Sequence, residues 1–130
     1  MDLQPTLTGD LILLRPLRRF DFEPLYRAAS DPFIWELHPQ QDRYTLPVFQ
    51  TYFDWAIESK GAFAIIDRKT GEIIGSSRYH DYDPLEKSVV VGYTFLSRAY
   101  WGGEYKPRIE AADVRACFSL GRCRALLYWW

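Results

Sequence analysis

The feature that most constrains the fold is the apolar run at residues 88–96, Ser-Val-Val-Val-Gly-Tyr-Thr-Phe-Leu. Nearly every residue in this run is apolar or β-branched, which is typical of a strand that is buried on both faces of a sheet. We therefore predict a central strand over residues 88–96. Gly92 lies midway along it, and a glycine inside a strand often marks a β-bulge or a close approach to the backbone.

The segments before this run predict a strand, a helix and a loop. An apolar stretch at residues 11–14 predicts a first strand that Pro16 closes. Asp21 is the expected cap of a helix whose apolar stripe extends to Ala29. The aromatic and polar segment at residues 33–44 predicts a loop or a single turn. Loops of this composition are plausible walls of a ligand site.

A second helix and a hairpin follow in the sequence. Thr45 is the expected cap of this helix and Gly61 its expected end, with an apolar stripe between them. A strand at residues 63–67, a turn at residues 69–71 and a strand from Ile73 onward are typical of a β-hairpin. The predicted order is strand, helix, helix, three strands, loop and helix.

Composition and charge restrict the class of protein. The chain has 130 residues, of which 48% are hydrophobic and 25% are charged, so we predict one domain over residues 1–130. Its formal net charge is -1, and its Lys and Arg residues are dispersed, so neither nucleic acid nor a membrane surface is an expected partner. A secretory signal and a membrane span are not apparent, which favours the cytoplasm. The spacing of Cys117 and Cys123 fits no common zinc or redox motif, and we expect free thiols and no metal.

Four short segments of the sequence, taken in their order, resemble a known protein family. They are "LTGDLILLRPL", "SDP" after the acidic helix, "GEIIGSSRY" and "VVVGYTFLSRAYWGGEY". Together they resemble the GNAT superfamily of acetyl-CoA-dependent N-acetyltransferases, in particular its ribosomal-protein N-acetyltransferase-like branch. The resemblance covers residues 7–105. It implies an α/β fold with three α/β/α layers and a mixed, mostly antiparallel sheet that lacks the usual C-terminal strands and helix.

The resemblance also implies the activity and the place of the cosubstrate. Members transfer an acetyl group from acetyl-CoA to a primary amine, on a protein N-terminus or a small molecule, by direct attack. Their central strand splays from its neighbour at a bulge and pairs with the acyl-pantetheine arm, and the next turn holds the pyrophosphate. The implied cofactor-binding residues are Tyr93, Thr94, Phe95, Leu96, Trp101, Gly102, Gly103, Glu104, Tyr105 and Lys106.

The turn fits the family pattern Q/R-x-x-G-x-G/A only in part. Small residues are needed there, because backbone N–H groups must converge on a dianionic pyrophosphate at a helix N-terminus. Gly102 and Gly103 meet this need, whereas Glu104 and Lys106 stand where the pattern has small residues. Taken alone, the segment fits an ordinary Gly-Gly turn equally well.

The sequence gives weaker signals for the residues that would bind the amine that accepts the acetyl group. Backbone N–H groups of residues 93–95 are the expected donors to the oxyanion that forms during acyl transfer. The candidate acceptor-binding side chains are Trp35, Glu36 and His38 on the loop, and Arg78, Tyr79 and His80 after the hairpin. Each of them also fits a structural role, and the sequence assigns no catalytic acid or base.

Residues 106–130 depart from the family pattern. A shift of the reading frame by one base from residue 106 permits a family-like continuation, so we hypothesise an out-of-frame tail, which the coding DNA would reveal or exclude. As written, the tail predicts a helix from Pro107 and, near its end, a short strand or a loose segment that favours association, including a homodimer. The alternative functions are a non-catalytic remnant that binds acyl-CoA weakly or not at all, and a small binding domain unrelated to CoA.

Overall fold

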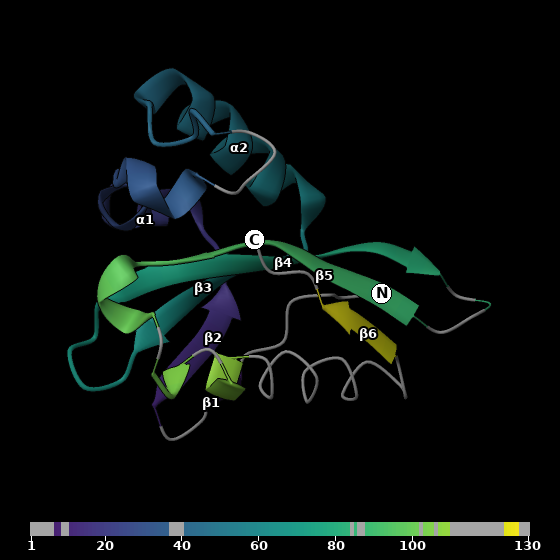
Figure 1. The fold of residues 1–130 in the computed structure, drawn as a ribbon. Coiled ribbons are helices and arrows are strands. Elements are labelled where there is room, and N and C mark those ends of the chain that lie inside the picture. Colours follow the sequence, from purple (N-terminus) through teal and green to yellow (C-terminus); the bar gives the residue numbers. More distant parts are fainter. Residues whose placement is uncertain are drawn as a thin grey trace.

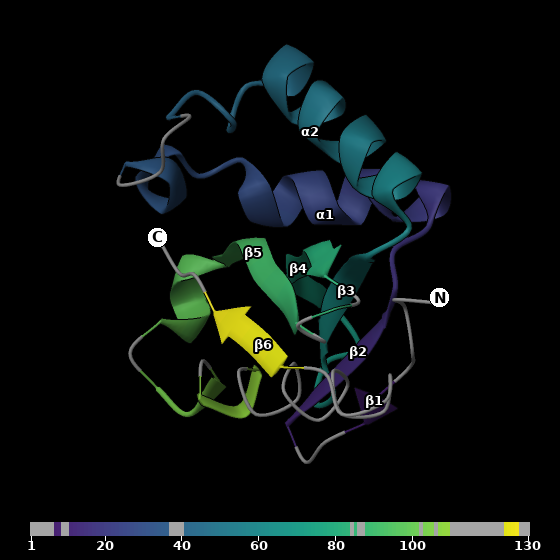
Figure 2. The ribbon, with the colours of Figure 1, turned by 90° about the vertical axis from the view of Figure 1, so that its right-hand side faces the viewer.

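The computed structural model shows one sheet, and the two α-helices of the described residues lie on the same face of it (Figures 1 and 2). It describes residues 7–8, 11–36, 41–83, 85, 88–101, 103–105, 107–109 and 124–127. The six strands are β1 (Leu7–Thr8), β2 (Ile12–Pro16), β3 (Ala62–Asp67), β4 (Ile73–Asp83), β5 (Ser88–Leu96) and β6 (Arg124–Leu127).

Strand order in the sheet follows the order in the chain, from β1 to β6. Pairing is antiparallel from β1 through β5 and parallel between β5 and β6. The predicted α/β class with a mixed, mostly antiparallel sheet is therefore confirmed. The predicted strand at residues 88–96 is β5, and a short strand also forms in the divergent tail.

The helices are α1 (Phe22–Ala29) and α2 (Leu46–Ser59), and short 3-10 turns occupy Arg19–Asp21, Pro32–Trp35 and Arg98–Tyr100. The helices predicted after Asp21 and after Thr45 are present, and Pro32–Trp35 is the single turn expected in the loop. None of the helices in the described ranges is long and apolar enough to cross a lipid bilayer.

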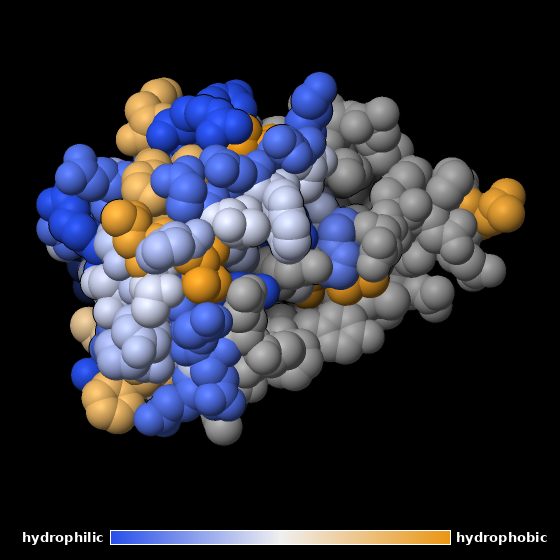
Figure 3. All heavy atoms as spheres, turned by 90° about the horizontal axis from the view of Figure 1, so that it is seen from above, coloured by the Kyte–Doolittle hydropathy of each residue, from blue (hydrophilic) through white to orange (hydrophobic). Residues whose placement is uncertain are grey.

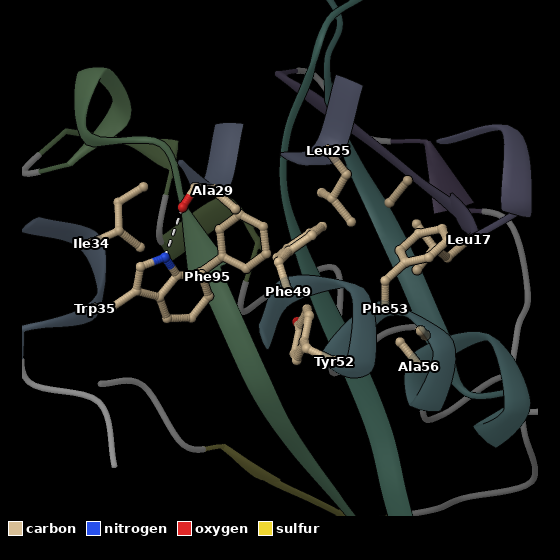
Figure 4. Close-up of a cluster of buried hydrophobic side chains, with 12 residues drawn as sticks. Leu17, Leu25, Ala29, Ile34, Trp35, Phe49, Tyr52, Phe53, Ala56 and Phe95 are labelled. Atoms are coloured by element: carbon tan, nitrogen blue, oxygen red, sulfur yellow. Dashed lines mark hydrogen bonds between the residues drawn. The ribbon is translucent and has the colours of Figure 1, made fainter. Parts of the chain in front are cut away.

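The core between the helices and the sheet is rich in aromatic residues (Figure 4). The centre of the Phe95 ring on β5 lies 5.0 Å from that of Trp35 and 6.3 Å from that of Tyr52, and the ring planes are tilted or edge-on. Burial of each such ring contributes about 2–3 kcal/mol. The cluster consists of Leu17, Leu25, Ala29, Ile34, Trp35, Phe49, Tyr52, Phe53, Ala56, Ala62, Ala64 and Phe95.

A second apolar cluster covers the opposite face of the sheet. Val91 and Leu96 of β5 belong to it, whereas Phe95 faces the helices, so β5 is packed on both faces as its apolar sequence predicts. The cluster consists of Ile12, Leu14, Phe63, Ile65, Ile74, Tyr79, Val91, Leu96 and Ile109.

The two predicted helix caps act differently from expectation. Asp21 precedes α1 but makes no side-chain cap bond. Its carboxylate instead accepts bonds from the Arg18 backbone N–H (2.8 Å) and from both terminal nitrogens of Arg15 (2.8 and 2.7 Å). Thr45 also makes no cap bond, because its hydroxyl donates to the Asp42 carbonyl at 2.8 Å. Nearby polar groups therefore compete with the helix ends for both side chains.

Gly61 does not end α2 by a left-handed conformation. Lys60 takes that conformation, with φ of 55°. Gly61 is needed for space instead, because a Cβ there would lie 2.3 Å from the Tyr79 carbonyl oxygen of β4.

Several large apolar side chains are exposed, among them Phe20, Leu46 and Trp55. Seen from the helical side, apolar residues at the surface are interspersed with hydrophilic ones (Figure 3). This face is therefore mixed in character over the part of the chain that the structure describes.

The partly buried Arg15–Asp21 pair should stabilise the fold more than the exposed Arg19–Asp54 pair. Replacement Asp21→Asn leaves the Arg15 guanidinium facing an amide, and we expect a loss of about 2–4 kcal/mol in the free energy of unfolding. The matched control Asp54→Asn should cost about 0.5 kcal/mol or less, because that pair is exposed. Urea unfolding measures both, and equal losses would contradict this ranking.

Gly75 should tolerate no side chain, because a Cβ there would lie 2.2 Å from the Phe95 carbonyl oxygen on β5. We expect Gly75→Ala to lower the free energy of unfolding by at least about 2 kcal/mol. A Cβ at Gly103 would meet nothing within 4 Å, and Gly103→Ala should stay within about 0.5 kcal/mol of the wild type. If Gly75→Ala is as stable as Gly103→Ala, β4 and β5 do not approach each other as closely at Gly75 as the structure shows.

Candidate functional site

The β-bulge expected near Gly92 is present in β5. Ser76 of β4 pairs with Phe95 of β5, and the next pair that the register shows is Arg78 with Gly92. Between these two pairs the chain advances by two residues along β4 but by three along β5. One more residue of β5 than of β4 therefore lies in this interval, at Tyr93 and Thr94. A bulge of this kind bends a strand and turns its backbone groups away from regular pairing.

Among the described residues, the second edge of β5 is paired along its first half only. Ser88 to Val91 pair in register with Arg124 to Leu127 of β6, which lies beside that half (Figure 1). From Gly92 to Leu96, no described strand pairs with β5 on this edge. Backbone N–H and C=O groups that point away from β4 there need other partners, since buried backbone groups are nearly always hydrogen-bonded.

The register shows which backbone groups face this open edge. The Ser97 N–H donates to the Ile74 carbonyl of β4 at 2.8 Å. Backbone groups alternate in direction along an antiparallel pair, so those of Phe95 also face β4 and those of Leu96 face away from it. The indole N–H of Trp101 donates to the Leu96 carbonyl at 2.8 Å. Trp101 thus occupies one end of the open edge.

The turn after β5 is only partly within the described residues. Gly102 and Lys106 lie outside them, while Gly103 and Glu104 are exposed. The Glu104 carbonyl accepts a bond from the Arg108 N–H at 3.3 Å, and residues 107–109 are helical. A helix therefore begins just after the turn, as the sequence predicts.

Three side chains, Asp67, Tyr100 and Tyr105, form what we call the Asp67 cluster. Asp67 ends β3 and is 3% exposed. Its carboxylate accepts hydrogen bonds from the Tyr100 hydroxyl (2.8 Å), the Tyr105 hydroxyl (3.2 Å) and the Lys69 backbone N–H (3.0 Å). The cluster therefore joins the end of β3 to the two ends of the turn after β5.

The pKa values in the cluster follow from these contacts. Burial by itself raises the pKa of the Asp67 carboxyl, but hydrogen bonds from Tyr100, Lys69 and Tyr105 together hold it below its usual value. Burial and the neighbouring carboxylate raise the pKa of Tyr100 to about 12, and they also raise the pKa of Tyr105. The cluster is thus one carboxylate held by two neutral phenols at neutral pH.

Two of the predicted acceptor-binding residues lie beside the bulge. Arg78 is 8% exposed and pairs with Gly92 on one side and with Ala62 on the other. Ala62 belongs to the helical-side core, so Arg78 and, two residues on, His80 point to that face. A Cβ at Gly92 would lie 3.0 Å from Nε2 of His80, so the imidazole lies against the Gly92 backbone.

The other predicted acceptor-binding residues do not gather at this point. Trp35 is fully buried and donates its indole N–H to the Ala29 carbonyl at 2.8 Å (Figure 4). Tyr79 is 1% exposed and packs edge-on against Phe63 on the opposite face of the sheet. Both belong to the apolar clusters of the fold, so the structural role that the sequence left open for them is present. Glu36 is exposed, and His38 lies outside the described residues.

Sequence reasoning missed two features near the site. The guanidinium of Arg43 lies 4.9 Å from the centre of the Tyr52 ring and 5.6 Å from that of Trp35. This places a cation over aromatic rings of the helical-side core. The Asp67 cluster was also missed, although an aspartate that ends an apolar strand is a signal worth testing.

A surface hollow of about 630 Å³ lies between α1 and the β3–β4 turn. Arg15, Arg27, Glu72 and Tyr100 are among its lining residues, and Gly92 is not. The hollow is therefore separate from the open edge at the bulge. The described residues include no group of three or more His, Cys, Asp or Glu side chains arranged to hold a metal ion.

Comparison with known proteins identifies the fold. A family model described as an acetyltransferase (GNAT) domain matches residues 12–127, which continues beyond Tyr105, where inspection of the sequence placed the end of the resemblance. No curated protein matches the sequence.

Three solved structures are similar to the chain. A GCN5-related N-acetyltransferase from Brucella melitensis has a TM-score of 0.75 at 19% identity, over 90% of this chain and 56% of that chain. A ribosomal-protein-S5-alanine acetyltransferase from Vibrio fischeri has a TM-score of 0.68 at 15% identity, over 89% and 68%. A spermidine N-acetyltransferase from Vibrio cholerae, in complex with CoA and spermine, has a TM-score of 0.61 at 13% identity, over 86% and 66%.

These likenesses show the fold, and the chain spans between 56% and 68% of the length of the three structures. The family match covers most of the sequence and includes the bulged strand, its open edge and the turn that follows. The protein belongs to the GNAT acetyltransferase domain family.

Proposed function

We propose that the protein is a cytoplasmic N-acetyltransferase of the ribosomal-protein N-acetyltransferase-like branch. It transfers an acetyl group from acetyl-CoA to a primary amine on a protein N-terminus or a small molecule. The observation that carries this proposal is the open edge of β5 beside the bulge at Tyr93 and Thr94. Membership of the family supports it, as do similar structures described as acting on a ribosomal protein and as complexed with CoA and spermine.

The open edge suits an extended acyl-pantetheine arm. Such an arm contains amide groups, and amides can pair with an exposed strand edge in the way an added strand does. The described pairing with β6 reaches Val91 and Leu127, and the arm would pair with β5 beyond these residues. The Leu96 carbonyl is already bonded to Trp101, so the arm would pair with the backbone between Gly92 and Thr94.

The turn after β5 suits the pyrophosphate. Gly103 is exposed, and a Cβ there would meet nothing within 4 Å, so its backbone is open to an approaching group. Glu104 is exposed as well, which lets its carboxylate face solvent rather than the phosphates. The turn leads into a helical segment whose N-terminal end attracts anions.

When bound, acetyl-CoA supplies an activated acyl group as a thioester. Because the backbone of Phe95 faces β4, the N–H groups of Tyr93 and Thr94 are the donors best placed to stabilise negative charge on the thioester carbonyl oxygen. The amine would reach the carbonyl from the helical side, where Arg78 and His80 flank Gly92. Holding the two reactants together in this way supplies much of the rate gain in acyl transfer.

The alternative is a truncated, non-catalytic remnant with weak or no acyl-CoA binding. The presence of Glu104 and Lys106 where the family pattern has small residues favours this alternative. The two candidates differ in affinity for acetyl-CoA.

Acetyl-CoA should raise the melting temperature of the wild type by about 10 °C at a hundred times its Kd. Gly103→Asp places a carboxylate at the turn and should weaken binding at least about tenfold, because charges near a protein surface repel by about 1–4 kcal/mol at 4 Å. Leu85→Asp is the matched control, since Leu85 is 93% exposed in the β4–β5 connection.

No shift at millimolar acetyl-CoA would favour the remnant. Equal losses in Gly103→Asp and Leu85→Asp would contradict the assignment of the turn to the pyrophosphate. Thiol release with a panel of primary amines then distinguishes an enzyme from a protein that only binds the cosubstrate.

A further inference from the structure

Two residues of the Asp67 cluster, Tyr100 and Tyr105, lie at the two ends of the turn that contains Gly103. Tyr100 and Tyr105 stand on either side of this turn in the sequence, yet both hydroxyls reach the same carboxylate. Their rings pack edge-on with centres 4.8 Å apart. The segment between them is therefore closed into a loop whose two ends share one anchor on β3.

Two further contacts fix this loop to the rest of the fold. Trp101 is bonded to the Leu96 carbonyl on β5 at 2.8 Å. Arg98 forms an ion pair with Asp31, and its guanidinium lies 4.6 Å from the centre of the Phe33 ring. The loop is thus anchored to β3, to β5 and to the segment that follows α1.

The hydroxyl chemistry limits what the tyrosines can do. A neutral phenol has one hydrogen to donate, and Tyr100 and Tyr105 donate theirs to Asp67. Neither hydroxyl is then a donor to a phosphate group. Their effect on a ligand must pass through the backbone of the turn that they hold.

If the cluster served only to stabilise the fold, buried apolar side chains would serve as well. Burial of a carboxylate has a desolvation cost that its hydrogen bonds must offset, and apolar groups of similar shape often stabilise as well. Hydrogen bonds are directional, however, and three of them converge on one carboxylate. Such an arrangement specifies the position and orientation of the turn.

We propose that Asp67, Tyr100 and Tyr105 are positioning residues that hold the turn so that its backbone meets the pyrophosphate of acetyl-CoA. This inference rests on the proposed function. Loss of the cluster should weaken the contribution of the pyrophosphate to binding and leave that of the acyl-pantetheine arm unchanged. The cluster acts on the cosubstrate without touching it.

Two ligands separate this role from a general structural one. Acetyl-CoA contains the pyrophosphate, whereas acetyl-pantetheine contains only the arm and the thioester. In the double variant Tyr100→Phe, Tyr105→Phe, affinity for acetyl-CoA should fall about tenfold, because the turn loses both hydroxyl bonds that hold it to Asp67. Affinity for acetyl-pantetheine should change less than about twofold.

Tyr26→Phe on α1 is the matched control, because it removes one hydroxyl bond, to the Tyr44 carbonyl at 2.9 Å. It should leave both affinities at their wild-type values. Equal losses for the two ligands, or no loss for either, would overturn the positioning role alone. A wild type that binds neither ligand would overturn the proposed function and this inference with it.

A spectroscopic measurement checks that the cluster forms in solution. The alkaline absorbance titration of the wild type minus that of Tyr100→Phe isolates Tyr100. Its midpoint should lie at about 12, because burial and Asp67 raise the pKa of Tyr100 from 10.0. A midpoint near 10.0 would show that Tyr100 is not bonded to Asp67, which would overturn the inference even if the double variant failed to fold.

Discussion

The structure depends on the unequal pairing of the two edges of β5. Its β4 edge is paired along the strand except at the bulge and at a second register shift between His80 and Asp83 of β4. Its β6 edge is paired only from Ser88 to Val91 among the described residues. A sheet normally leaves few backbone groups inside a fold without partners. The stretch from Gly92 to Leu96, whose second edge no described strand pairs, is therefore the place where this fold can accept an extended ligand, and the other parts of the candidate site are arranged around it.

The open edge remains in position because both faces of β5 are packed. Phe95 is held among aromatic rings beneath the helices, while Val91 and Leu96 belong to the core on the opposite face. The close approach of Gly75 to Phe95 sets the distance between β4 and β5. Contacts of the Asp67 cluster and of Trp101 then extend this rigid frame to the turn beyond the strand. A preorganised frame lowers the ordering cost of binding.

Local patterns predicted the elements well and the side-chain roles poorly. The apolar run gave β5 its bounds, and a glycine inside it indicated the bulge, because both signals are local. Trp35 and Tyr79 were predicted at a ligand site but lie in the core, since burial depends on which face of an element meets its neighbours. Asp67 contacts Tyr100 and Tyr105, which lie 33 and 38 positions further along the sequence, and no local pattern reports such a contact. Lys60 took the left-handed position expected of Gly61, and Gly61 is needed instead because β4 leaves no room for a side chain there.

Amide hydrogen exchange with and without saturating acetyl-CoA tests the central claim most directly. If the open edge of β5 binds the acyl-pantetheine arm, exchange should slow at residues 92–96 and in the turn at residues 101–105, while β2 on the far side of the sheet remains unchanged. Binding of acetyl-CoA with unaltered exchange at residues 92–96 would contradict the claim and place the ligand elsewhere on the protein.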